Sequence, residues 1–148
     1  MADRRRTRAS RCVERVTVPS PEVAYYNYPE TGNINSAGLI PLNEVLLLSE
    51  NISTVDNSSI RLLNGVYKVS FSSVGVPSSE QRVGAGIYLN NNSTNIISLA
   101  SSNENKRYPL SGVGVVVSSS DNTLLSLRNF GNAPASYLFT NLVVEKLT

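Results

Sequence analysis

The 148-residue chain contains no histidine, no tryptophan and a single cysteine, Cys12. Without histidine, a serine or cysteine nucleophile has no imidazole base to activate it. One cysteine cannot form a disulfide within the chain, and Cys12 has no cluster of Cys, His or carboxylates around it that would indicate a zinc site. The carboxylates are spread over expected turns and strand ends, whereas a glycoside hydrolase needs a close pair. The sequence therefore predicts no catalytic residues, no metal site and no cofactor.

Long apolar runs and charged residues are also scarce. No run approaches the about 18 apolar residues that cross a bilayer, and no apolar stretch follows the basic N-terminus as in a secretory signal. We therefore expect no membrane span, and a protein that works where it is made or leaves the cell by lysis or within a particle. Only 16% of the residues are charged, and seven scattered prolines argue against long helices.

Strand alternation is what the sequence does contain. After the turn at Asn64-Gly65, the side chains of Tyr67, Val69 and Phe71 point to one face and their neighbours to the other. Similar short segments continue to the C-terminus, separated about every 8–12 residues by Gly, Pro, Asn and Ser. About nine or ten strands are expected, with no segment of helical period, which indicates an all-β sandwich or barrel.

Two of the expected strands carry glycines on one face. Gly84 and Gly86 alternate with aliphatic residues, and Gly112 and Gly114 alternate with valines. A face without side chains allows close approach of another backbone, or leaves room for a ring from Tyr88 or from another subunit. A β-bulge or a barrel corner would explain the same pattern.

Residues 1–27 are expected to form an extended arm with a basic end. Residues 1–16 carry six arginines against two acidic residues, a charge of +4, whereas the remaining residues carry −2. Arginine pairs well with carboxylates on a protein surface, and residues 15–18 could add a strand to another protein's sheet. A frayed terminus is the alternative. The residues expected to anchor the chain to a partner protein are Arg4, Arg5, Arg6, Arg8, Arg11, Val13, Arg15, Val16 and Val18.

The same arginines could instead neutralise phosphates of a nucleic acid. A nucleic-acid-binding protein usually spreads basic and aromatic residues over a folded face. Here the folded body is slightly acidic. We therefore do not expect nucleic acid as a partner, and high-affinity, salt-sensitive DNA binding by residues 1–20 would be needed to support that role.

Residues 28–38 are expected to form a neck that joins the arm to a head domain of residues 39–148. Prolines and glycines interrupt this segment, and three tyrosines lie in or next to it. Tyr25, Tyr26 and Tyr28 could pack around an oligomer axis or on a partner surface, or cover the base of the head itself.

Two segments of the head resemble a known superfamily. Residues 65–71 (Gly-Val-Tyr-Lys-Val-Ser-Phe) resemble the Gly-x-Tyr-x-Ile/Val-x-Tyr/Phe strand of the C1q/tumour-necrosis-factor superfamily. Residues 124–129, a glycine-containing turn and residues 141–147 resemble the C-terminal domain of the collagen-like spore-surface glycoprotein BclA. The core residues of these motifs are Gly65, Tyr67, Val69, Phe71, Leu125, Leu127, Leu142 and Val144. The resemblance implies an all-β, ten-stranded antiparallel jelly-roll sandwich that assembles as a tight homotrimer without enzymatic activity.

One departure from that resemblance bears on function. BclA carries a collagen stalk of Gly-x-y repeats before this domain, whereas this chain has a short basic arm. A trimeric head on a short arm resembles the head fibres and decoration proteins of phage capsids. We therefore expect a structural protein on the capsid surface of a virion, attached through residues 1–27. Loops near 77–82, 101–109 and 118–122 are candidates for contact with a host surface protein or glycan.

A ligand-binding module is the alternative function. In that case the chain would be the head of an adhesin on a bacterial spore or cell surface, and a required export or coat-targeting partner would favour it.

Overall fold

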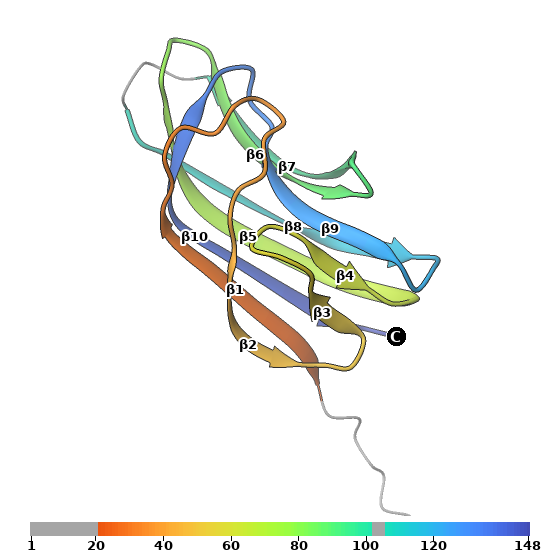
Figure 1. Cartoon of the computed structure of the whole chain (residues 1–148). Helices are drawn as coiled ribbons and strands as arrows, with labels where there is room; N and C mark the ends of the chain where they lie inside the picture. Colours follow the sequence, from red (N-terminus) through yellow and green to blue (C-terminus); the bar gives the residue numbers. More distant parts are fainter. Residues whose placement is uncertain (1–20, 102–105) are drawn as a thin grey trace, which may run out of the picture.

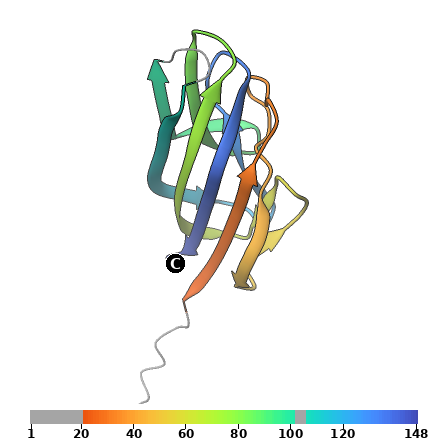
Figure 2. The same cartoon turned by 90° about the vertical axis from the view of Figure 1, so that its left-hand side faces the viewer.

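The structure, a computed structural model, describes residues 21–101 and 106–148, which form two facing antiparallel sheets (Figure 1, Figure 2). Among these residues there are strands, turns and bends but no helix. The prediction of an all-β, ten-stranded jelly-roll sandwich is confirmed. The strands are β1 (Glu22–Glu30), β2 (Asn43–Leu48), β3 (Ile52–Thr54), β4 (Ile60–Leu62), β5 (Gly65–Pro77), β6 (Arg82–Leu89), β7 (Asn92–Ser101), β8 (Tyr108–Ser118), β9 (Thr123–Asn129) and β10 (Ala135–Lys146).

Each sheet has five strands. Sheet A has the order β2-β1-β10-β5-β8, and sheet B has the order β3-β4-β9-β6-β7. The chain crosses repeatedly between the sheets, so that β1 lies beside β10 from the far end of the sequence. This interleaving of two antiparallel sheets is the jelly-roll arrangement. It leaves β2 and β8 as the edges of sheet A.

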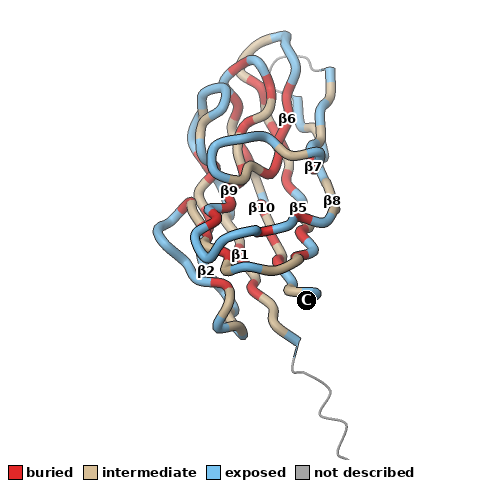
Figure 3. Tube along the Cα trace, turned by 90° about the vertical axis from the view of Figure 1, so that its right-hand side faces the viewer, coloured by how far each residue is buried: buried red, intermediate tan, exposed pale blue. Residues whose placement is uncertain are grey.

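The core lies between the sheets and is built by strand alternation. Figure 3 shows a long buried stretch along β6, which lies between β9 and β7 in sheet B. Gly65 opens β5 at a point where a Cβ atom would come within 2.7 Å of the backbone oxygen of Thr148. The other family-motif residues are all buried, namely Tyr67, Val69, Phe71, Leu125, Leu127, Leu142 and Val144.

The predicted boundaries of arm and neck are wrong for residues 22–38. β1 (Glu22–Glu30) lies between β2 and β10, and its Ala24 and Tyr26 are completely buried. The segment after β1 stays on the sandwich, because Thr31 donates from its backbone to Tyr137 and Ile34 forms a β-bridge with Ala135. β1 pairs with a strand more than a hundred residues away, so its place could not be read from local sequence. The head therefore includes residues 22–38.

Both pairs of glycines are covered within the chain. A Cβ atom on Gly112 would lie 2.6 Å from Cε1 of Phe71, and one on Gly114 would lie 2.6 Å from Cγ1 of Ile96. On sheet B, a Cβ atom on Gly84 would lie 2.8 Å from Cδ1 of Leu99, and one on Gly86 would lie 2.9 Å from Cγ2 of Ile97. The bare faces thus allow close packing of neighbouring side chains, and Tyr88 is not the residue that fills them.

Candidate functional site

The edge strand β8 carries an exposed stripe of valines. Since Gly112 and Gly114 face the core, strand alternation turns the intervening residues outward. Val113, Val115 and Val117 are 65%, 59% and 64% exposed. Edge strands are usually protected by charges or prolines, but residues 110–118 of β8 contain neither. An unprotected apolar edge of this kind is typical of a surface that another chain covers.

The stripe continues across the outer surface of sheet A. Val113 lies beside Ser70 of β5, which lies beside Val143 of β10. Val143 lies beside Tyr25 of β1, and Tyr25 lies beside Leu46 of β2. A second row runs from Val115 through Lys68, Glu145 and Val23 to Leu48. We call this surface the apolar face; its nonpolar residues are Val23, Tyr25, Leu46, Leu48, Val66, Val113, Val115, Val117 and Val143.

A polar row borders the apolar face. Ser111, Ser72, Asn141 and Asn27 lie side by side across β8, β5, β10 and β1. The Tyr25 hydroxyl donates to Oδ1 of Asn141 at 2.6 Å, which holds the tyrosine ring against the sheet. Neutral polar side chains therefore form the border of the apolar face. Within the face, the two charged residues, Lys68 and Glu145, carry opposite signs.

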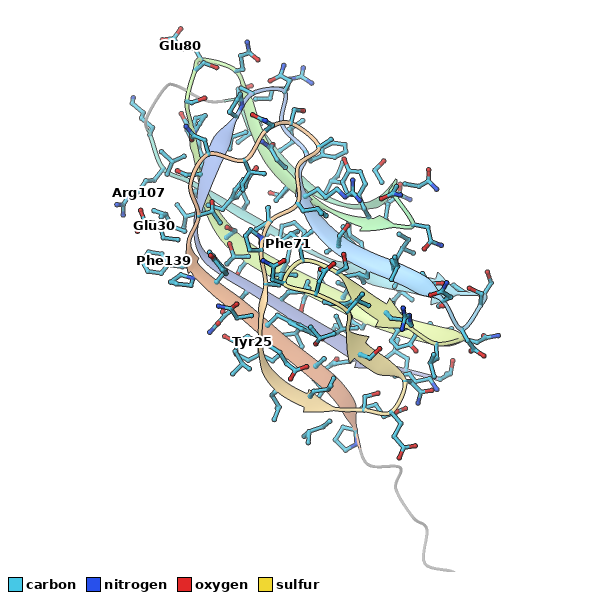
Figure 4. The ribbon with its side chains drawn as sticks, in the orientation of Figure 1. Tyr25, Glu30, Phe71, Glu80, Arg107 and Phe139 are labelled. Carbon is cyan, nitrogen blue, oxygen red and sulfur yellow. The ribbon has the colours of Figure 1, made fainter. Side chains whose placement is uncertain are left out.

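Beyond the polar row, β10 bulges and exposes an aromatic ring. The pairing of β10 with β5 shifts between Leu138 and Asn141, and Phe139 within the shift has a φ of 51°. Positive φ is unusual for a bulky residue and costs about 1–3 kcal/mol. The Phe139 side chain is nevertheless 65% exposed, and it points outward on the same side of the molecule as Tyr25 and Glu30 (Figure 4).

Two hollows flank Asn141 next to this bulge. The larger, of about 350 Å³, is lined by Asn27, Tyr28, Pro29, Phe139, Thr140 and Asn141. The smaller, of about 190 Å³, is lined by Ser70, Phe71, Ser72, Asn141 and Val143. The outer surface of sheet A thus combines a projecting ring with recesses beside it.

The three tyrosines expected to pack together in a neck are separated by strand alternation. Tyr26 points into the core, where its hydroxyl lies 3.0 Å from Oγ1 of Thr54, and burial raises its pKa. Tyr25 lies on the apolar face, and Tyr28 lines the larger hollow. Tyr25 therefore lies on the outer surface of sheet A, Tyr26 in the core and Tyr28 at the larger hollow, and none of the three belongs to a separate neck.

Hydrogen bonds secure the start of β1, close to where the described chain begins. Glu22 accepts hydrogen bonds from Asn51 at 2.6 Å and Ser49 at 3.0 Å, and its carboxylate lies 3.8 Å from Nζ of Lys146. The hydrogen bond from Asn51 is the main reason why the pKa of Glu22 is lowered. This cluster ties β1 to the β2–β3 turn and to the end of β10.

The outer face of sheet B carries a smaller cluster. The Arg128 guanidinium lies 5.0 Å from the centre of the Tyr88 ring, and the Tyr88 and Phe130 rings are 6.4 Å apart. Arg128 also donates to Ser126 and to Asn91. The Arg128 guanidinium therefore has its contacts within this cluster. No pattern in the sequence predicted the cluster.

The remaining predicted sites are dispersed or lie elsewhere in the chain. All the arginines and valines expected to anchor the chain lie in residues 1–20, outside the described residues. The connection after β5, which carries Glu80 (Figure 4), lies at the opposite end of the sandwich from the β8–β9 turn, so the candidate contact loops do not form one site.

Neither a metal site nor a membrane-spanning helix is found in the part of the chain that the structure describes. No group of three or more Cys, His, Asp or Glu there could hold a metal ion. In residues 21–101 and 106–148, no helix has the length and apolarity needed to cross a membrane.

Solved structures resemble this chain in fold. The globular domain of zebrafish complement 1qA protein matches with a TM-score of 0.67 and 11% identity, covering 87% of this chain and 98% of that chain. Eiger TNF from S. frugiperda matches with a TM-score of 0.70 and 10% identity, covering 86% and 93%. The PRD1 vertex protein P5 matches with a TM-score of 0.56 and 10% identity, covering 86% and 97%.

These matches confirm the predicted C1q/TNF-like fold, and at such low identity they show the fold alone. No protein-family model and no curated protein matches the sequence. The resemblance to the BclA domain stays a prediction.

Proposed function

We propose that this chain is a homotrimeric structural protein, a head fibre or decoration protein of a viral (phage) capsid. Three jelly-roll heads associate through the outer surface of sheet A, and the N-terminal arm attaches the trimer to a capsid protein. The observation that carries the proposal is the apolar face, with Val113, Val115 and Val117 each more than half exposed on an unprotected edge strand.

The size of the surface suits self-association. Five strands about 4.8 Å apart and about eight residues long, at about 3.3 Å a residue, give a face of roughly 600 Å². A stable interface buries about 800 Å² on each partner. The face together with the free edge of β8 comes close to this area. In a cyclic assembly each head would contact two neighbours, one through each of two different patches.

The charges are compatible with contact between copies. Lys68 and Glu145 are neighbours across β5 and β10, so the face holds one positive and one negative group. A second copy can meet them without bringing like charges together. The resemblance to C1q/TNF-like domains implies the same homotrimeric assembly.

A place on a capsid is supported by two features. The PRD1 vertex protein P5 has this fold, and a vertex protein belongs to the shell of a particle. The arginine-rich end provides charge for a protein surface, and three arms in one trimer would make weak single attachments multivalent. The arm ends before β1, since Glu22–Glu30 belongs to sheet A.

The test is co-sedimentation of the full chain with purified phage particles. A variant with Arg4, Arg5 and Arg6 changed to glutamine should lose at least tenfold in binding while remaining a trimer. A control with glutamine at the exposed Arg82 and Arg107 of the head should bind like the parent. If the full chain does not bind, the capsid role is refuted and an adhesin head on a spore or cell surface becomes the better account. Removal of residues 1–27 is unsuitable, because it would delete most of β1.

A further inference from the structure

Phe139 combines two features that are unfavourable in a single head. Its backbone has a φ of 51° inside the β10 bulge, and its ring is 65% exposed. A bulky residue with positive φ is rare, and such a conformation persists where the surrounding structure imposes it, often at a binding site. Bulges are also known to redirect side chains. The backbone of β10 thus holds a phenyl ring away from the sheet, where the ring adds little to the packing of the core of its own head.

A recess of matching size lies on the same surface. The smaller hollow, of about 190 Å³, is lined by Ser70, Phe71, Ser72, Asn141 and Val143. An apolar cavity of about 150 Å³ is enough to hold a benzene ring. Its wall includes Val143 of the apolar face and Phe71, whose side chain is buried on the core side of β5. A phenyl ring would therefore meet nonpolar atoms as well as the two serine side chains.

We propose that Phe139 is the anchor residue between copies of this chain, and that its ring enters the smaller hollow of the neighbouring copy. The inference rests on the proposed homotrimer and names the contact that holds it together. Buried aromatic residues near the centre of an interface commonly contribute most of the binding energy. The bulge lies on β10, the central strand of sheet A, beyond the polar row but on the same outer surface as the apolar face. Because this is the surface through which the copies are proposed to associate, the proposed occupant is a second copy.

The positions of ring and hollow are compatible with a three-fold axis. The centre of the hollow lies two or three residues along β10 from Phe139, which is about 7–10 Å at about 3.3 Å a residue. Around a three-fold axis, equivalent points are separated by √3 times their distance from the axis. Since a rotation keeps each point at the same height, the line from Phe139 to the hollow must be perpendicular to the axis, and both would then lie about 4–6 Å from the axis.

The experiment measures assembly and subunit stability separately. Full-length parent, F139A and F139G are diluted and analysed by sedimentation velocity, and the unfolding of the dissociated subunits in urea is followed by circular dichroism. Both variants should need at least about tenfold more protein to assemble. Because glycine favours positive φ, the F139G subunit should be as stable as the parent subunit or more stable. A phenylalanine with a merely structural role would lose stability when truncated.

Two controls separate failure of the anchor from failure of the homotrimer. Phe130 is a partly buried phenylalanine on the other sheet, and F130A should assemble like the parent. V115E should dissociate the assembly through the apolar face. If V115E dissociates it but F139A assembles like the parent, the anchor is refuted and the homotrimer stands. A parent that stays monomeric at all concentrations refutes both.

The position of the ring is tested by filling the hollow. Ser70 lines it between Val113 and Val143, so S70L should weaken assembly by occupying the space. If the ring of Phe139 enters this hollow, the double variant F139A/S70L should be little weaker than either single variant. Additive losses would show that the ring lies elsewhere and would overturn the assignment.

Discussion

Replacing Gly114 by alanine tests how β8 closes the sandwich. The added Cβ atom would lie 2.6 Å from Cγ1 and 2.9 Å from Cδ1 of Ile96. Ile96 is only 5% exposed and belongs to the core, so it has little space in which to move away. Extra methyl groups in a packed core cost about 1–3 kcal/mol, whereas alanine in place of a strand glycine returns about 0.5–1 kcal/mol. We expect the free energy of unfolding to fall by about 1–2 kcal/mol.

The assay is thermal and urea unfolding at a concentration where parent and variant have the same oligomeric state. For a domain of this size, each kcal/mol changes Tm by about 3–5 °C, so G114A should unfold about 3–10 °C lower. The matched control is G32A, because no atom lies within 4 Å of the Cβ position at Gly32. I96V shortens the opposing side chain and should reduce the effect of G114A when the two are combined.

A G114A variant as stable as the parent would refute this account of β8. It would mean that the glycine side of β8 does not face Ile96. The valines on its other side would then not be fixed on the outside, and the apolar face would lose its structural basis.

Three further predictions concern polar groups of the head. Burial raises the pKa of Tyr137, so the stability that the protonated side chain gives is complete below about pH 10 and declines above it. Y137F should flatten this decline. Through loss of the hydrogen bond to Gly84 it should also cost about 1 kcal/mol at pH 7, and urea unfolding at pH 7 and above about pH 10 measures both effects. Asn129 is completely buried and bonds two backbone carbonyls and one backbone amide, so N129A should cost about 3–5 kcal/mol in the same assay. The lowered pKa of Glu22, caused mainly by Asn51, gives stability above about pH 4.3 that is lost as the pH falls, so E22Q should reduce the acid dependence by less than about 1 kcal/mol. An unchanged pH dependence in Y137F or E22Q, or a parent-like N129A, would contradict the corresponding assignment.

The sequence predicted the strands of the head well because period-2 alternation depends on the local chain. The alternation of Tyr67, Val69 and Phe71 predicts a strand with one buried side, and all three are buried in β5. Turn residues after each segment also predicted the number of strands. These features need no knowledge of which strand pairs with which.

Pairing between distant strands is what the sequence left open. The sequence places β1 in an arm and a neck because β10, which pairs along nearly its whole length, lies more than a hundred residues away, and β2 follows only after an irregular connection over residues 31–42. Alternation on β8 defines two faces but does not say which is inside, and the decision depends on Phe71 and Ile96 filling the space over the glycines. The β10 bulge carries no local signal either, since it exists only relative to β5. The apolar face and Phe139 therefore could not be recognised as a site before the sheets were assembled.

The most direct test of the account is the mass of the full chain in solution, measured by light scattering during size-exclusion chromatography, beside V115E. The account predicts about 48 kDa for the parent, three times the 16.0 kDa of one chain, and a shift toward 16.0 kDa for V115E at the same concentration. V115E should keep the circular dichroism and unfolding of the folded head, because Val115 is 59% exposed in the single chain. A parent mass of 16.0 kDa at high concentration, or a V115E variant that stays at about 48 kDa, would contradict assembly through the outer surface of sheet A.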